Sequence, residues 1–113
     1  MKVLKFKPLE IVPDEWYLAS IENIEVNEDK RRIYVRVILD DYPDDVFVKS
    51  IPLSSNIRSQ AANLFESLQL LNKRGEVKLE EAEGLRVIVT LKEASDYAVY
   101  INGIELYNEE EEE

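Results

Sequence analysis

The chain has 113 residues, contains neither Cys nor His, and carries a formal net charge of −10. The absence of these two residue types excludes disulfides, thiol nucleophiles, imidazole bases, Cys/His zinc sites and Ser-His-Asp triads. Five of its 24 acidic residues form the terminal run at 109–113, which leaves 19 acidic residues against 14 Lys and Arg. The body of the chain is therefore only moderately acidic.

The composition is that of one globular domain. Apolar residues make up 45% and charged residues 34% of the chain, which is too apolar for a disordered polymer. We expect one domain over residues 1–107 and a disordered acidic tail over residues 108–113. Because no apolar run approaches 18 residues and Lys and Pro interrupt the N-terminal stretch, we predict no membrane helix or secretory signal and expect a cytoplasmic protein. The many Glu, Lys and Arg residues suggest a thermophilic source.

Alternation of apolar and polar residues predicts strands in the first half of the chain. Three strands are expected at residues 15–26, 31–39 and 46–53, and a shorter candidate strand at 2–7 precedes them. In the strand at 15–26 the apolar residues alternate as far as Ile21 and then resume one position out of phase, at Ile24 and Val26. Such a shift indicates a β-bulge or a sharp bend. The acidic segment 40–45 is expected to form the turn between the last two strands.

The second half begins with a pattern typical of a helix. Ser54, Ser55 or Asn56 is expected to cap its N-terminus, and Gly75 to end it. The apolar residues between them recur at helical spacing: Ile57, Ala61, Leu64, Phe65, Leu68 and Leu71. After an acidic connector, two more strands are expected at 85–93 and 97–106.

This order of elements predicts the fold. Three antiparallel strands, one helix and a two-stranded hairpin are the plan of the OB-fold, in which the helix lies between the third and fourth strands. A long, bent early strand agrees with that plan, since it must serve both sheets of the barrel. We therefore expect a mainly β fold, a five-stranded OB-fold Greek-key barrel with one helix, while other small barrels and α+β folds stay open.

The strands around the acidic turn set aromatic and basic residues between their apolar positions. If the aliphatic residues, including Val46 and Val48, face inward, the period of two turns four side chains outward: Tyr34, Arg36, Phe47 and Lys49. A shift of one residue on the second of these strands would bury Phe47 and Lys49 instead. The cost of burying an ammonium group argues against that shift.

These outward residues fit a single-stranded nucleic acid. Pairing across the turn sets Arg36 opposite Lys49, and two like charges so placed favour an anion such as a phosphate between them. Tyr34 and Phe47 would then stack unpaired bases. Supporting contacts are expected from Trp16, Arg31, Arg32 and Arg86, and weaker ones from Lys92 and Tyr100. The alternative is that these residues are ordinary surface β-formers paired with neighbouring acids.

Enzyme and metal chemistry receive little support from the sequence. The four carboxylates within 40–45 lack the Gly and the spacing of a calcium loop, so we predict a solvated hairpin tip and no metal. The three glycines stand far apart, which excludes a glycine-rich phosphate loop. We expect a protein that is not an enzyme and uses no cofactor.

The segments "PDEWYLASIENIEV", "IYVRVIL", "VFVKSIPL", "AANLFESLQLL" and "EGLRVIVTLKE", with "YAVYINGIEL" at the end, resemble small phage- and plasmid-type single-stranded DNA-binding proteins with an OB core. The resemblance covers residues 13–107. It implies DNA binding in replication, recombination or repair, and an acidic tail that recruits partner proteins. The chain departs from the family in two places: the tail has no terminal hydrophobic residue, and Asp14 and Glu15 stand where an entry glycine is usual.

The expected function is therefore binding of single-stranded DNA, with RNA as another ligand and no membrane. The tail would recruit replication and repair proteins or compete with DNA. The alternative is an OB-fold module that binds proteins and no nucleic acid, which the net acidity favours. Outward Arg and Lys scattered among acids would support that alternative. A DNA-mimicking inhibitor is a third reading, and outward Ile38 and Ile88 hint at a homo-oligomer.

Overall fold

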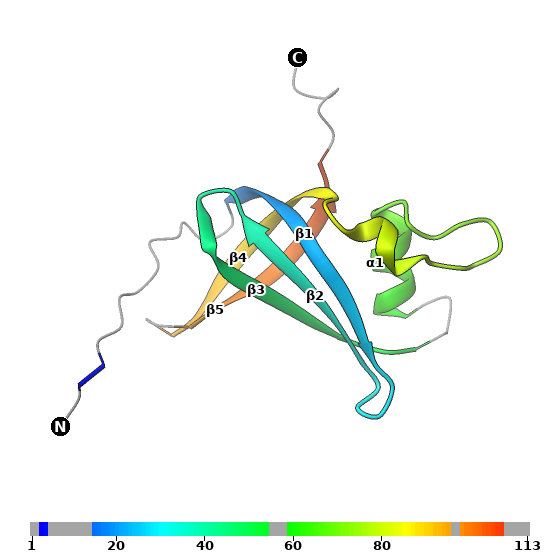
Figure 1. Cartoon of the computed structure of the whole chain (residues 1–113), viewed down its shortest axis with the longest axis horizontal. Helices are drawn as coiled ribbons and strands as arrows, with labels where there is room; N and C mark the ends of the chain where they lie inside the picture. Colours follow the sequence, from blue (N-terminus) through cyan, green and yellow to red (C-terminus); the bar gives the residue numbers. More distant parts are fainter. Residues whose placement is uncertain (1–2, 5–14, 55–58, 96–97, 108–113) are drawn as a thin grey trace, which may run out of the picture.

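The computed structural model describes residues 3–4, 15–54, 59–95 and 98–107. Its elements are β1 (Trp16–Asn27), β2 (Arg32–Leu39), β3 (Tyr42–Pro52), α1 (Gln60–Ser67), the 3-10 helix η1 (Leu79–Ala82), β4 (Arg86–Ser95) and β5 (Ala98–Leu106). The strands form one antiparallel sheet in the order β3-β2-β1-β4-β5, and α1 lies beside one end of it (Figure 1). The predicted mainly β fold, with one α-helix between the third and fourth strands, is confirmed.

The sheet is open, with β3 and β5 as its edge strands, although these two edges approach each other. Of the strand predicted at 2–7, only Val3 and Leu4 are described. They are exposed and belong to no strand. The rest of that segment and the tail at 108–113 lie outside the described residues.

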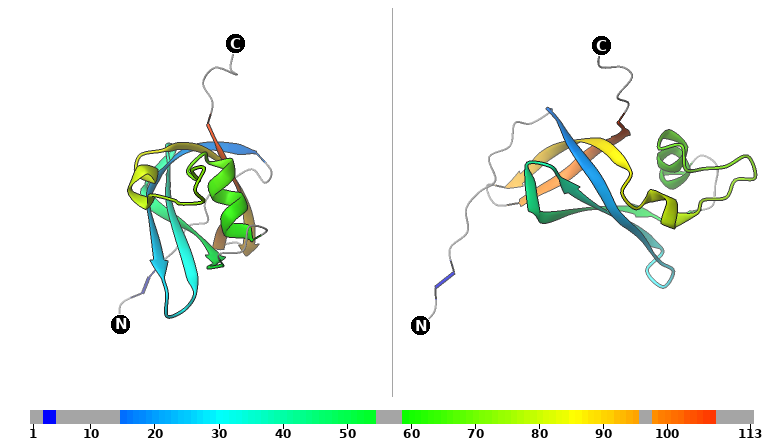
Figure 2. Two further views of the ribbon diagram at one scale, coloured as in Figure 1. Left: turned by 90° about the vertical axis from the view of Figure 1, so that its right-hand side faces the viewer. Right: turned by 45° about the horizontal axis from the view of Figure 1, so that its top comes forward.

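β1 is long and bent, as the sequence predicts. Its first part, as far as Ser20, pairs with β4, and its second part, from Ala19 onward, pairs with β2. Figure 2 shows it crossing from one half of the sheet to the other. The pairing with β2 shifts between Ile21 and Asn23, so the predicted phase shift is confirmed as a β-bulge. The extra residue keeps the inward phase from Ile21 to Ile24, and both side chains are buried.

The core lies on one face of the sheet and is covered at one end by α1. Alternation along β2 buries every second residue, as predicted, and the same pattern recurs on β4. Ala61, Leu64 and Phe65 supply the buried face of α1. The most deeply buried side chains of the sheet are Ile21, Ile33, Val35, Val37, Leu39, Val87, Val89 and Leu91. We call this side the inner face of the sheet and the opposite side its outer face.

The predicted orientation of β3 is wrong. Phe47 is 8% exposed and packs in the core, whereas Val46 and Val48 are exposed on the outer face. The turn is shorter than expected, because β3 already begins at Tyr42, and the pairing with β2 shifts between Ile38 and Leu39. This irregularity reverses the faces of the rest of the strand.

Lys49 accordingly lies on the inner side of β3, next to Val35, and not opposite Arg36, whose partner is Val48. Its side chain is only partly buried. β3 is an edge strand, so a long aliphatic stem can follow the core while the ammonium group reaches water past the edge. The burial cost that argued against this register is therefore small.

α1 is shorter than predicted. Its N-cap is Ser59, whose Oγ accepts a hydrogen bond of 3.1 Å from the amide of Ala62. Ser54 is not the cap; its carbonyl accepts a bond from the Ser59 hydroxyl, and the other two candidate caps lie outside the described residues. The helix ends at Ser67 because Gln69 turns into the left-handed region at φ 60°, and Leu70 then donates its amide proton to the carbonyl of Phe65. This is a Schellman ending, placed well before Gly75.

Replacing Phe47 tests the orientation of β3. We expect Phe47→Ala to lower the free energy of unfolding by about 3 kcal/mol or more, since it removes a large buried ring. Val48→Ala, the matched control on the exposed side of the same strand, should change it by no more than about 0.5 kcal/mol. Urea unfolding followed by circular dichroism measures both. Equal effects of the two substitutions would contradict the observed register.

Candidate functional site

The outer face carries the side chains with the best access to a ligand. The strand pairing arranges these side chains along β1. One group lies near the first residue of β1, and another lies near its last residue. The face includes three aromatic residues, four basic residues, several aliphatic residues and one glycine that faces an indole. These residues are Trp16, Leu18, Arg32, Tyr34, Arg36, Ile38, Val46, Val48, Arg86, Ile88, Lys92, Tyr100 and Gly103.

At the start of β1, Trp16 lies across β4. It pairs with Thr90, which in turn pairs with Gly103 on β5. A Cβ atom at Gly103 would lie 3.0 Å from the Thr90 hydroxyl and 3.7 Å from the far end of the indole, atom Cη2. The indole therefore extends over the glycine, and Trp16 is still 45% exposed. A Cβ atom at residue 103 would be crowded by the Thr90 hydroxyl, while its distance to the indole is that of an ordinary van der Waals contact.

Tyr100 and Lys92 face each other on β5 and β4, just beyond the indole. Tyr100 is 46% exposed, and Lys92 is exposed and forms no ion pair with another described residue. We call Trp16, Lys92, Tyr100 and Gly103 the aromatic platform. It offers two accessible ring systems beside a cation, which suits a flat, anionic ligand.

At the other end of the outer face, Arg32, Tyr34 and Arg36 alternate along β2. Tyr34 is partly buried between Glu25 on β1 and Ser50 on β3. Arg32 donates from Nε to the Ser50 hydroxyl at 2.9 Å. The three side chains are brought together because residues two apart on a strand share a face. They form a second aromatic and basic group.

The guanidinium of Arg36 contacts the carboxylate of Glu25 and the side-chain amide of Asn23. Its Nη1 donates to Glu25 Oε2 at 2.7 Å and to Asn23 Oδ1 at 3.2 Å. Both contacts use the same nitrogen. The other nitrogens of the guanidinium make no hydrogen bond to a described residue, so they can still meet a ligand.

Arg86 lies between the two ends of the outer face, where β4 and β2 both adjoin β1. It donates to both carboxylate oxygens of Asp40, at 2.9 and 2.6 Å, and to the Ser20 hydroxyl at 2.6 Å. These hydrogen bonds, together with the charge of the guanidinium, lower the pKa of Asp40. Arg86 thus fixes the β2–β3 turn to the rest of the sheet.

The structure divides the predicted binding residues into two sets. Trp16, Arg32, Tyr34, Arg36 and Arg86 share the outer face. Arg31 is exposed in the adjoining turn at φ 53°. Phe47 and Lys49 are on the inner side, so the expected stacking by Phe47 and the expected Arg36–Lys49 pair are not part of this surface.

The sequence pattern alone gives too little weight to the platform. Tyr100 and Lys92 are outward by alternation, but their value depends on Trp16, which lies on the strand next to Lys92 and two strands from Tyr100. The pair "NG" at 102–103 is the signal that could have drawn attention to it, because a glycine within a strand often marks a bulge or a close approach. The β4–β5 pairing is indeed irregular there.

The comparisons with known proteins add no relative: no protein-family model, no curated protein and no solved structure matches the chain. In the described part of the chain, acidic side chains do not gather in groups of three or more that could hold a metal ion. None of the helices that the structure describes has the length and apolar character needed to cross a membrane.

The Asp40–Arg86 pair should make stability depend on pH. The guanidinium holds the pKa of the folded carboxyl below the ordinary 3.8, so the stabilisation is complete above that value and is lost as the pH falls through the lower folded pKa. We expect Asp40→Asn to reduce stability at pH 7 by no more than about 1 kcal/mol, because the pair is exposed.

Thermal unfolding at neutral and acidic pH measures this difference, which should shrink well below pH 3.8. Asp41→Asn is the matched control, since the neighbouring carboxylate makes no ion pair with a described residue. A deficit of Asp40→Asn that is as large in acid as at neutral pH would show that the ion pair is not its cause.

Proposed function

We propose that the chain binds single-stranded nucleic acid, and DNA in particular, along the outer face of its sheet. In this proposal it catalyses no reaction. One observation carries the proposal: aromatic rings lie beside cations at both ends of a single sheet face, exposed at Trp16 and Tyr100 and partly buried at Tyr34. Base faces stack on such rings at about 1 to 3 kcal/mol per base, and the cations meet the phosphates.

The length of the face suits a short stretch of strand. Glu25, the neighbour of Tyr34, lies nine positions after Trp16 on β1. At about 3.3 Å per residue this is a path of about 30 Å, shortened by the bend. Such a path fits a site of about four nucleotides, at the small end of the range for OB-folds.

The arrangement of the strands supports a more specific proposal, that of an OB-fold. The element order, the bent β1 and the approach of β3 to β5 are those of an OB-fold Greek-key barrel, and we propose that the sheet closes in this way. In that fold the face of the second and third strands binds oligonucleotides. A role in replication, recombination or repair, with the acidic tail contacting partner proteins or DNA, belongs to the same proposal.

A second candidate is a protein-binding module. Arg36 and Arg86 are each paired with a carboxylate, which is the scattering among acids that favours this alternative. Val46 and Val48 add exposed apolar area to the outer face. An aliphatic surface with neutralised charges suits a protein partner better than a phosphate backbone.

Titration with labelled oligo-dT tests the proposal, followed by anisotropy and by the fluorescence of Trp16. We expect binding that weakens by about twentyfold between about 50 and 200 mM salt, as about three phosphate contacts require. Trp16→Ala and Tyr34→Ala should each weaken it by about tenfold, because each removes a stacking surface.

Trp16→Phe is the matched control and should stay within about threefold of the original affinity, since it keeps an aromatic face. Circular dichroism verifies that each variant is folded. Absence of binding, or binding that does not respond to salt, would reject the nucleic-acid proposal and leave the protein-binding module.

Removing the acidic tail provides a separate test of its role. A chain ending at Asn108 loses five glutamates, so its net charge falls from −10 to −5. We expect tighter binding of oligo-dT, by about threefold or more at low salt, because repulsion and competition by the polyanion are removed. Replacing the five glutamates with glutamines is the control for length. Unchanged affinity in both variants would restrict the tail to partner proteins.

A further inference from the structure

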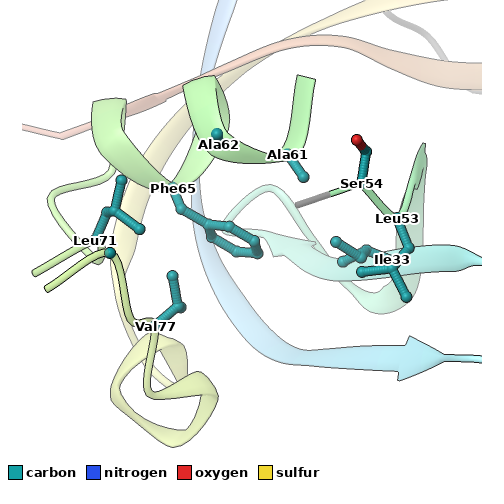
Figure 3. Close-up of a pocket in the computed structure, with 9 residues that line it drawn as sticks. Ile33, Leu53, Ser54, Ala61, Ala62, Phe65, Leu71 and Val77 are labelled. Carbon is teal, nitrogen blue, oxygen red and sulfur yellow. The ribbon is translucent and has the colours of Figure 1, made fainter. Parts of the chain in front are cut away.

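An apolar pocket opens between α1 and the end of the sheet where β2 and β3 meet. Its volume is about 270 Å³. Figure 3 shows the ring of Phe65 between Leu71 and Val77 on one side and Ile33 and Leu53 on the other. Ala61 and Ala62 border it from the helix, and their small side chains leave the space open. The pocket is smaller than most ligand sites and fits one side chain of the size of Leu or Phe.

The loop that forms one wall of this pocket also lines a basic hollow. Gly75 and Val77 line the pocket, while Lys73, Arg74 and Lys78 line a hollow of about 410 Å³ together with Asn72 and Glu76. The three cations face a single acid there, on a body in which acids outnumber bases. None of the three forms an ion pair with another residue that the structure describes.

The loop is held in shape by its own hydrogen bonds. Asn72 accepts through Oδ1 from the amides of Arg74 and Glu76, both at 2.9 Å, and Leu71 pairs with Val77 across the loop. Gly75 supplies the required left-handed turn at φ 77°. The cations are therefore presented from a defined backbone next to the pocket, which limits the entropy lost on binding.

We propose that the pocket and the basic hollow together form a docking site for an acidic peptide segment of a partner protein. One large apolar side chain of that segment enters the pocket against Phe65. Its carboxylates contact Lys73, Arg74 and Lys78. The charge of the loop selects the acidic segment, and the size of the pocket selects a single anchor residue. This site is separate from the outer face and does not depend on nucleic-acid binding.

The test uses the full chain and a fluorescein-labelled peptide with one Phe flanked by Asp and Glu residues. We expect saturable binding by anisotropy, weakened by about tenfold when the peptide Phe is replaced by Ala, since the anchor is then lost. Ala62→Leu, which fills the pocket, should weaken it to a similar degree. Lys73→Glu combined with Arg74→Glu, both on an exposed loop, should weaken it by about fivefold or more.

Lys30→Glu is the control for charge reversal, because this exposed lysine of the β1–β2 turn lines neither the pocket nor the basic hollow, and it should stay within about twofold. Loss of peptide binding through the loop charges alone, with no effect of the peptide Phe, would overturn the proposal, as would no binding at all. A large gain in affinity in the chain ending at Asn108 would also overturn it, because the chain's own tail would then be the occupant.

Discussion

The bulge in β1 is the constraint on which the rest of the structure depends. A strand that pairs with β4 in its first part and with β2 in its second part must turn between them, and the extra residue between Ile21 and Asn23 provides that turn. Both backbone groups of Ile21 hold the bend against residues 84 and 85. Its amide donates to the Leu85 carbonyl at 2.9 Å, and its carbonyl accepts from the Gly84 amide at 2.8 Å. Gly84 adopts φ 82°, a conformation that most side chains disfavour.

The same bend divides the outer face into two ends with different neighbours. Trp16 lies where β1 adjoins β4, with β5 on the far side of β4, and Tyr34 lies where β2 adjoins the far end of β1. Arg86, Asp40 and Ser20 meet at the point of crossing. Their network joins β1 and β4 to the β2–β3 turn, so it helps to fix the angle between the two ends. The spacing of the aromatic groups is thus set by backbone pairing and one ion pair, and not by the aromatic residues themselves.

The sequence predicted those features that depend on neighbours along the chain. The phase shift before Ile24, the alternation on β2 and the single helix are local patterns, and the structure contains all three. The faces of β3 could not be predicted in this way, because both of its alternating sets contain apolar residues. The charge of Lys49 favoured the orientation that turns this side chain outward. That orientation is wrong because β3 is an edge strand, where an ammonium group on the inner side still reaches water.

The aromatic platform shows a second limit of the same kind. Alternation puts Tyr100 and Lys92 on an outward face, but it does not say that β4 separates Trp16 from β5, nor that the indole lies over Gly103. Strand order is a long-range property, and a bulge on β5 shifts the phase of residues near it. A site assembled from three strands therefore becomes visible only once the pairing is known.

The ion pairs of Arg36 and Arg86 reconcile an acidic protein with a face proposed to bind phosphates. Glu25 and Asp40 keep the guanidinium groups oriented, so a phosphate that approaches finds donors already placed and exchanges one anion for another. At Arg86 this exchange requires the Asp40 carboxylate to leave, which lowers affinity and favours a site that releases its ligand readily, whereas Arg36 contacts its partners through Nη1 alone. Because the pKa of Asp40 is lowered, acidification to pH values just below the ordinary carboxyl range would not remove this competitor. If the proposed binding takes place on this face, its affinity would therefore come mainly from stacking on Trp16, Tyr34 and Tyr100 and less from the cations.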